Sequence, residues 1–230
     1  MNVLTAMEMD AIALSLRVSS VAVVASLPFG ILVAWILARC RFPGRAVLDA
    51  IVHLPLVLPP VVVGYMLLVA FGRRGLIGEF LNDTFGISIA FSWQGAAIAG
   101  SVMAFPLMVR AIRLSIESID TGLEQAARTL GSPPWRVFLT VTLPLSFPGL
   151  LTGCLLAFAR SLGEFGATVA FVSNIPGETQ TMPLALYALI NTPGGEQGAL
   201  RLVIAAVALS FAALLVSEFL ARRLSNRHEA

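Results

Sequence analysis

Residues 18–38 have the sequence VSSVAVVASLPFGILVAWILA, and this stretch, from Val18 to Ala38, decides the fold class of the chain. It contains no charged residue and is followed directly by Arg39. A helix needs about 20 mostly apolar residues to cross the hydrocarbon core of a bilayer. The stretch is therefore predicted to be a membrane-spanning helix.

The composition of all 230 residues extends this interpretation to the whole chain. Hydrophobic residues make up 57% and charged residues only 12%, whereas a soluble domain carries about 25% charged residues. The apolar residues also lie in long blocks. We therefore expect a single domain over residues 1–230, an all-α integral membrane protein in which large surfaces face lipid.

Further apolar blocks predict about five transmembrane helices. Glu8 and Asp10 near the N-terminus have the wrong charge for a cleaved signal peptide, so the first block is expected to be retained. The second block is rich in proline, with Pro55, Pro59 and Pro60. The predicted spans are Val18–Ala38, Ala50–Phe71, Trp93–Val109, Val137–Ala159 and Leu202–Ser217.

Five spans place the two termini on opposite sides, and the arginines predict which side is which. Loops rich in positive charge lie in the cytoplasm. With the N-terminus outside, ten of the fifteen basic residues fall inside: Arg39, Arg41, Arg45, Arg110, Arg113, Arg128, Arg136, Arg222, Arg223 and Arg227. The N-terminus is thus expected to be periplasmic and the C-terminus cytoplasmic.

Residues 166–198 are too polar to span as a whole, although Met182–Ile190 is apolar. We expect an outer, periplasmic loop that carries a short re-entrant or interfacial helix. The alternative is a sixth span, which would put the arginine-rich C-terminus outside.

The inner loop between the third and fourth spans is predicted to contain a short helix. Thr121-Gly-Leu-Glu124 fits a capping box, in which the two side chains accept from free backbone N–H groups. Gly131 suits a helix stop, and Pro133-Pro134 prevents continuation. On this helix, small side chains allow close approach of another protein and leucines offer apolar anchors: Ala126, Ala127, Leu123 and Leu130.

The same loop carries a recognisable pattern. Glu124-Gln-Ala-Ala, then Gly131 and later Val141-Thr-Leu-Pro144, resembles the EAA signature of ABC-importer permeases, with mild departures at Gln125 and Val141. The resemblance implies a type I ABC importer permease fold, with a cytoplasmic coupling helix in loop 119–132 that docks on an ATP-binding subunit. Carried onto this chain, the docking residues are Leu123, Glu124, Ala126, Ala127, Leu130 and Gly131.

Three other stretches, residues 53–65, 159–168 and 171–179, resemble the molybdate type within the sulfate/molybdate/tungstate group of these permeases. This implies a multi-pass protein of the bacterial inner membrane that acts as a homodimer. Its partners would be two ATP-binding cassette subunits and a periplasmic oxyanion-binding protein, with no nucleic acid and no cofactor. Tungstate or sulfate remains the alternative substrate.

Candidates for the ion pathway come from charged residues and helix breaks. Arg160 and Glu164 are four residues apart at the outer end of the fourth span, with Ser161 between them. Ionisable residues within a membrane indicate function, so Arg160 could attract an anion while Glu164 tempers that attraction. The alternative is a simple intrahelical pair. Pro59 and Pro60 bend the second span and either line the pathway or form packing kinks.

What the sequence lacks also narrows its function. All fifteen basic residues are arginine, so a phosphate-binding loop of the GxxxxGK[ST] type, which needs lysine, is excluded. No catalytic residues or metal site are expected, because His53 stands alone in its apolar run and Cys40 and Cys154 suggest neither a disulfide nor a metal. An ion-coupled secondary transporter is a rival class, but it would place carboxylates near the midplane. Here the acidic candidates lie at span ends: Asp49, Glu117, Glu164 and Glu218.

Overall fold

The computed structural model describes residues 4–225, and all regular structure in that part of the chain is helical. This confirms the predicted all-α class. The helices are α1 (Ala6–Arg39), α2 (Arg45–Val57), α3 (Pro60–Phe71), α4 (Leu76–Phe85), α5 (Trp93–Glu117), α6 (Thr121–Thr129), α7 (Pro134–Val137), the π-helix η1 (Phe138–Thr142), α8 (Leu143–Leu145), α9 (Phe147–Leu162), α10 (Gly166–Val172), α11 (Met182–Ile190) and α12 (Glu196–Ser225).

Three helices are long and apolar enough to cross a membrane alone, namely α1, α5 and the first part of α12, Glu196–Ala213. Two further crossings are present if each of two bent helix pairs is taken as a single span. Helices α2 and α3 meet at 113°, and the segment Pro134–Leu145 meets α9 at 68°. The total of up to five agrees with the predicted number of spans.

The spans predicted over 50–71 and 137–159 are each divided by a sharp bend at the expected prolines. Pro59 and Pro60 follow the end of α2 at Val57, and prolines both remove a backbone donor and clash with the preceding turn. Pro144 and Pro148 lie on either side of the second bend, where α8 ends at Leu145. The sequence showed these prolines but not how sharply they turn the chain.

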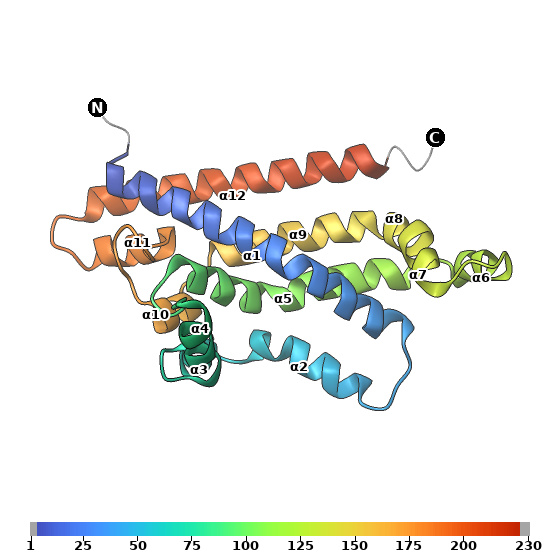
Figure 1. The fold of residues 1–230 in the computed structure, drawn as a ribbon. Helices are drawn as coiled ribbons and strands as arrows, with labels where there is room; N and C mark the ends of the chain where they lie inside the picture. Colours follow the sequence, from blue (N-terminus) through green and yellow to red (C-terminus); the bar gives the residue numbers. More distant parts are fainter. Residues whose placement is uncertain (1–3, 226–230) are drawn as a thin grey trace.

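Helices α1, α5 and α9 form the core (Figure 1). Small residues let them approach closely: a side chain at Gly153 would press against Met108 and Ile112 of α5, and one at Gly100 would meet Ser161 of α9. Alanines such as Ala34, Ala96 and Ala157 are fully buried in the same layer. Close helix contact through small residues is typical of membrane bundles.

Helices α10 and α11 lie at the end of the molecule where α1 begins (Figure 1). Helix α11 has 9 residues and is thus too short to cross a bilayer on its own. It packs against α1 and α12, and the backbone N–H of Met182 donates to Ser15 Oγ of α1 at 2.6 Å. That it dips into the membrane face stays a prediction.

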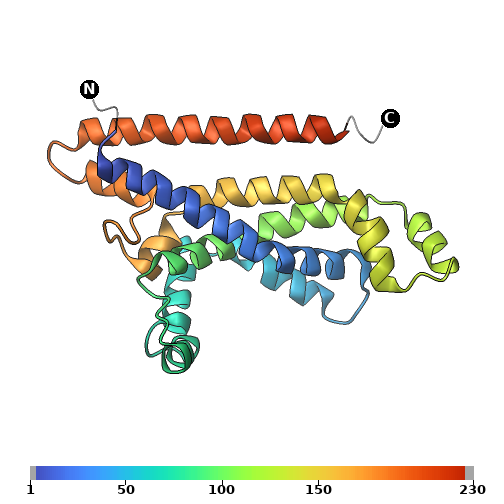
Figure 2. The same cartoon turned by 45° about the horizontal axis from the view of Figure 1, so that its top comes forward.

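The opposite end carries α6. Both views show α1 and α12 finishing at the end where α6 projects, whereas α1 starts at the far end (Figures 1 and 2). Glu8 ties α1 to α12 at that far end, because Arg201 Nη2 donates to Glu8 Oε1 at 2.7 Å. Glu8 also accepts from the Thr5 backbone N–H in a true capping box at the start of α1.

Candidate functional site

Helix α6 is a short, sharply bounded helix at the end of the molecule. Asp120 is its N-cap, and Asp120 Oδ1 accepts from the Gly122 backbone N–H at 2.8 Å. At the other end, Gly131 adopts φ +87°, its N–H donates to Arg128 O, and the Ser132 N–H donates to Ala127 O. These two bonds form a Schellman stop. The predicted glycine stop is therefore present.

The predicted capping box at Thr121 and Glu124 is wrong. Thr121 is already inside the helix, and Asp120 takes the capping position one residue earlier. Aspartate is as good an N-cap as serine or threonine. The Glu124 carboxylate does not reach back to the helix start, because two other segments hold it.

Glu124 is buried and joins α6 to two other parts of the chain. Arg39 Nε, at the end of α1, donates to Glu124 Oε1 at 3.2 Å, and Thr142 Oγ1 donates to the same oxygen at 2.7 Å. Arg39 Nη2 also donates to the Ile119 carbonyl at 3.2 Å, directly before α6. The Glu124 side chain is only 9% exposed. We call Arg39, Glu124 and Thr142 the Glu124 tie.

The π-helix η1 brings Thr142 to this tie. It lies immediately before Leu143-Pro144, and the proline ring would clash with the carbonyl four residues earlier in a regular α-helix. A widened turn relieves that clash, and such turns are frequent at functional sites. Thr142 is almost completely buried as a result.

The remaining face of α6 is open. Leu123 and Leu130 are 51% and 87% exposed. Ala126 and Gly131 are also exposed, and Ala127 is half-buried. Five of the six predicted docking residues thus lie on or near the free surface. Glu124 does not, because its carboxylate points inward to the tie.

The pathway candidates lie away from α6. Arg160 pairs with Glu164 as expected, but not on one helix face, because α9 ends at Leu162. The Glu164 carboxylate is buried and accepts from the Ala167 N–H at 2.8 Å, which caps the start of α10. Its role is therefore partly structural.

The structure brings Pro60 close to this region and keeps Ser161 apart from it. Gly166 packs so closely on Pro60 that a side chain there would lie 2.8 Å from the ring. Pro59 is exposed at the α2–α3 bend. Ser161 is buried against Gly100 of α5, so in this conformation it packs between helices.

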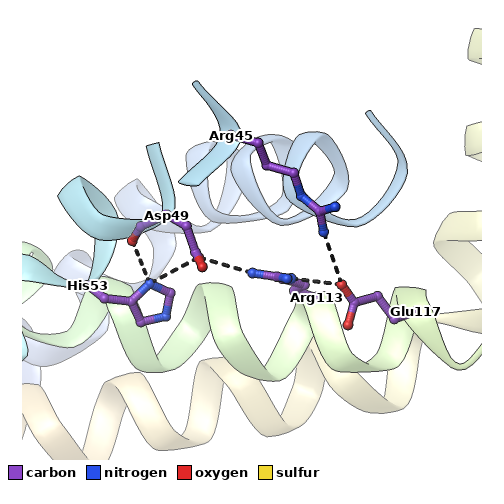
Figure 3. A network of polar contacts seen from close by, with 5 residues as sticks. All are labelled: Arg45, Asp49, His53, Arg113 and Glu117. Carbon is purple, nitrogen blue, oxygen red and sulfur yellow. Dashed lines mark hydrogen bonds and ion pairs between the residues drawn. The ribbon is translucent and has the colours of Figure 1, made fainter. Parts of the chain in front are cut away.

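Several polar residues of the structure had no assigned role in the sequence. Arg39 and Thr142 are the partners of Glu124, and a second group joins α2 to α5 through Arg45, Asp49, His53, Arg113 and Glu117 (Figure 3). The sequence signal that could have revealed this second group is the spacing of four residues between Asp49 and His53 and between Arg113 and Glu117.

Among residues 4–225, no three His, Cys, Asp or Glu side chains gather as metal ligands do.

Replacing Glu124 by alanine should loosen α6 and leave Arg39 half-buried without its partner. Losing hydrogen bonds to a charged group costs about 1.5–3 kcal/mol, and we expect Thr142→Val to cost less because Arg39 keeps its carboxylate. Hydrogen exchange at the amides of residues 121–129 in the detergent-purified protein measures the effect. Thr140→Val, which removes an exposed hydroxyl whose hydrogen bond goes to the Arg136 carbonyl one turn earlier, is the control. Equal exchange in Glu124→Ala and Thr140→Val would show that the tie does not hold α6.

Comparison with known proteins places the chain in a transporter family. Residues 26–227 match the family described as "Binding-protein-dependent transport system inner membrane component". The chain is 66% identical over 220 residues to the molybdenum transport system permease protein ModB of Escherichia coli (strain K12), covering 96% of each chain. It is 58% identical over 221 residues to ModB of Haemophilus influenzae, again covering 96% of each. The sulfate transport system permease protein CysT of Escherichia coli is 42% identical over 159 residues, 69% of this chain and 57% of that one.

Solved structures show the same fold at lower identity. The chain superposes with a TM-score of 0.75 on a bacterial ABC transporter involved in the import of alginate, at 17% identity, covering 95% of this chain and 80% of that one. It superposes with a TM-score of 0.66 on the MetNI methionine ABC transporter, at 18% identity and covering 94% of each. The protein is therefore a multi-pass permease subunit, and it belongs to the family of binding-protein-dependent transport system inner membrane components.

Proposed function

We propose that this chain forms the translocation pathway of an ATP-driven ABC importer for molybdate in the bacterial inner membrane. The support is the 66% identity, over nearly the full length of both chains, to a permease named for molybdenum transport. The sulfate permease is more distant and aligns with only 69% of this chain. Molybdate is thus favoured over sulfate, and tungstate, which has the same charge and tetrahedral shape, remains the alternative.

The single structural observation that carries the coupling role is the Glu124 tie beneath the open face of α6. A helix that only filled a loop would not need a buried carboxylate shared by two other segments. Because Glu124 contacts Arg39 at the end of α1 and Thr142 in η1, a movement of α6 acts directly on α1 and, through η1 and α8, on the segment that leads into α9. Leu123, Ala126 and Leu130 offer the surface on which a partner would push.

The partners in this proposal follow the family. The chain has no lysine for a phosphate-binding loop, so two ATP-binding cassette subunits supply hydrolysis and dock on α6. A periplasmic oxyanion-binding protein delivers the anion at the opposite end, and a second copy of the chain completes the pathway. The relative positions of the helix ends fit a periplasmic start of α1 and a cytoplasmic end of α12, since α12 finishes at the α6 end (Figure 2).

At the outer end, Arg160 is the candidate for meeting the anion. Its side chain is 28% exposed, and Glu164 already neutralises part of its charge. Passage through a membrane protein requires sites that bind weakly enough to release. A paired arginine satisfies that requirement better than a free one.

Valine at Gly131 should separate the chain from its ATP-binding subunit. Gly131 has φ +87°, which a β-branched residue adopts only with strain, so the Schellman stop and the position of Leu130 would change. We expect loss of co-purification of the ATP-binding subunit with unchanged membrane insertion. Gly177→Val, at φ +78° in the loop between α10 and α11, is the matched control and should keep the subunit. Full association of Gly131→Val would show that docking lies elsewhere.

Uptake by the complete complex in liposomes tests the transport proposal. Labelled molybdate should accumulate only when ATP and the ATP-binding subunits are present, and unlabelled tungstate should compete for the pathway. Competition by sulfate measures how far the complex separates the three anions. Uptake driven by a proton gradient, by this chain without an ATP-binding subunit, would instead establish a secondary transporter.

A further inference from the structure

Helix α2 is weakly attached to the rest of the molecule. Of its residues, all within the described chain, only Val52 is buried. Val47, Ile51 and Val57 are 62%, 62% and 82% exposed. A groove of about 440 Å³ separates α2 from α1 and α5 along its inner side. Apolar packing therefore holds α2 at few points.

The polar face of α2 makes the stronger connection. Arg45, Asp49 and His53 follow at intervals of four residues and so lie on one face, toward α5 (Figure 3). Arg113 Nη1 of α5 donates to Asp49 Oδ1 at 3.0 Å, while Arg113 Nε donates to Glu117 Oε1 at 2.8 Å. Arg45 Nη2 lies 3.7 Å from the same Glu117 oxygen.

Arg113 is thus shared between a carboxylate of α2 and one of its own helix. The flat guanidinium group can serve two carboxylates at once, which an ammonium group cannot do in the same geometry. All four charged side chains are partly exposed, from 24% for Arg113 to 40% for Asp49. Partly exposed ion pairs are individually weak, so such a cluster can hold a helix and still open.

The position of α2 places this charged cluster close to the junction between α5 and α6. Helix α2 meets α3 at 113° across Leu58 and Pro59, so no continuous helix fixes the direction of α2 relative to α3. Its charged face lies toward the end of α5 that leads into α6, because Glu117 is the last residue of α5 and α6 begins at Thr121. A movement of α6 therefore acts close to the cluster.

We propose that Arg45, Asp49, Arg113 and Glu117 form a polar latch that holds the half-helix α2 on α5 and opens when α2 moves during transport. The second part of this proposal rests on the proposed function; the first part does not. A cavity of about 310 Å³ beside Asp49, Arg113 and Glu117 leaves space for the side chains to separate.

Chemical labelling of Val52 tests the latch in the complete complex. A Val52→Cys reporter, in a chain with Cys40→Ser and Cys154→Ser, should react slowly with N-ethylmaleimide while the latch is closed. Asp49→Asn and Arg113→Gln should each raise the labelling rate. The double variant should be no faster than the faster single variant, because both changes remove the same interaction.

Two controls separate release of α2 from a general loss of structure. Arg74→Gln removes a positive charge from an exposed residue between α3 and α4 that makes no ion pair with a described residue and does not line the cavity beside Asp49, and it should leave the rate unchanged. A Met103→Cys reporter, buried on α5 in a different hydrophobic cluster from Val52, should stay unreactive throughout. The latch is refuted if Asp49→Asn labels no faster than Arg74→Gln, or if Met103→Cys becomes reactive together with Val52→Cys.

Addition of ATP to the complex that carries the Val52→Cys reporter but no change in the latch tests opening during transport. ATP should raise the labelling of Val52→Cys, and an unchanged rate in a complex that imports molybdate would overturn the opening. If the complex imports no molybdate with ATP, the proposed function fails, whereas the labelling of Asp49→Asn without ATP still decides whether the latch holds α2.

Discussion

The Glu124 carboxylate accepts from Arg39 at 3.2 Å and from Thr142 at 2.7 Å, and it does so at a nearly buried position. A buried carboxylate is costly unless it is paired and hydrogen-bonded, and here three segments meet to satisfy it. Helix α6 owes its orientation to this contact, since few of its other side chains are buried. The exposed leucines of α6 can serve as a docking surface only while this contact holds the helix in place.

The two broken crossings obey a different constraint. Backbone groups inside a bilayer must find partners within the protein, and breaks survive only where neighbouring segments or a cavity supply them. At the first break, α3 packs tightly on α10 through Gly64 and Gly166. At the second, η1 and α8 lead into α9, and Ser146 accepts from the Leu150 N–H at 3.0 Å through its carbonyl. Both breaks lie next to candidate functional residues.

The all-α class and the number of spans could be predicted from the sequence, because the length of an apolar block follows from bilayer thickness. The glycine stop at Gly131 was also predictable, since it depends on local backbone geometry alone. The role of Glu124 was not. The Glu124 carboxylate could serve either a local capping box or a long-range contact. Only the folded structure shows that it binds Arg39 and Thr142 and does not cap its own helix. The pairing of Arg113 with Asp49 was hidden for the same reason, as it joins residues 64 positions apart.

In the function proposed for this chain, α6 is the surface through which an ATP-binding subunit acts on the permease. Cross-linking from a single cysteine tests it most directly, in a complex lacking Cys40 and Cys154. Leu130→Cys, at an 87% exposed position on the edge of α6, should cross-link to the ATP-binding subunit, and Ile190→Cys, 65% exposed at the end of α11, should not. An intact complex in which Leu130→Cys gives no cross-link while Ile190→Cys does would contradict the account.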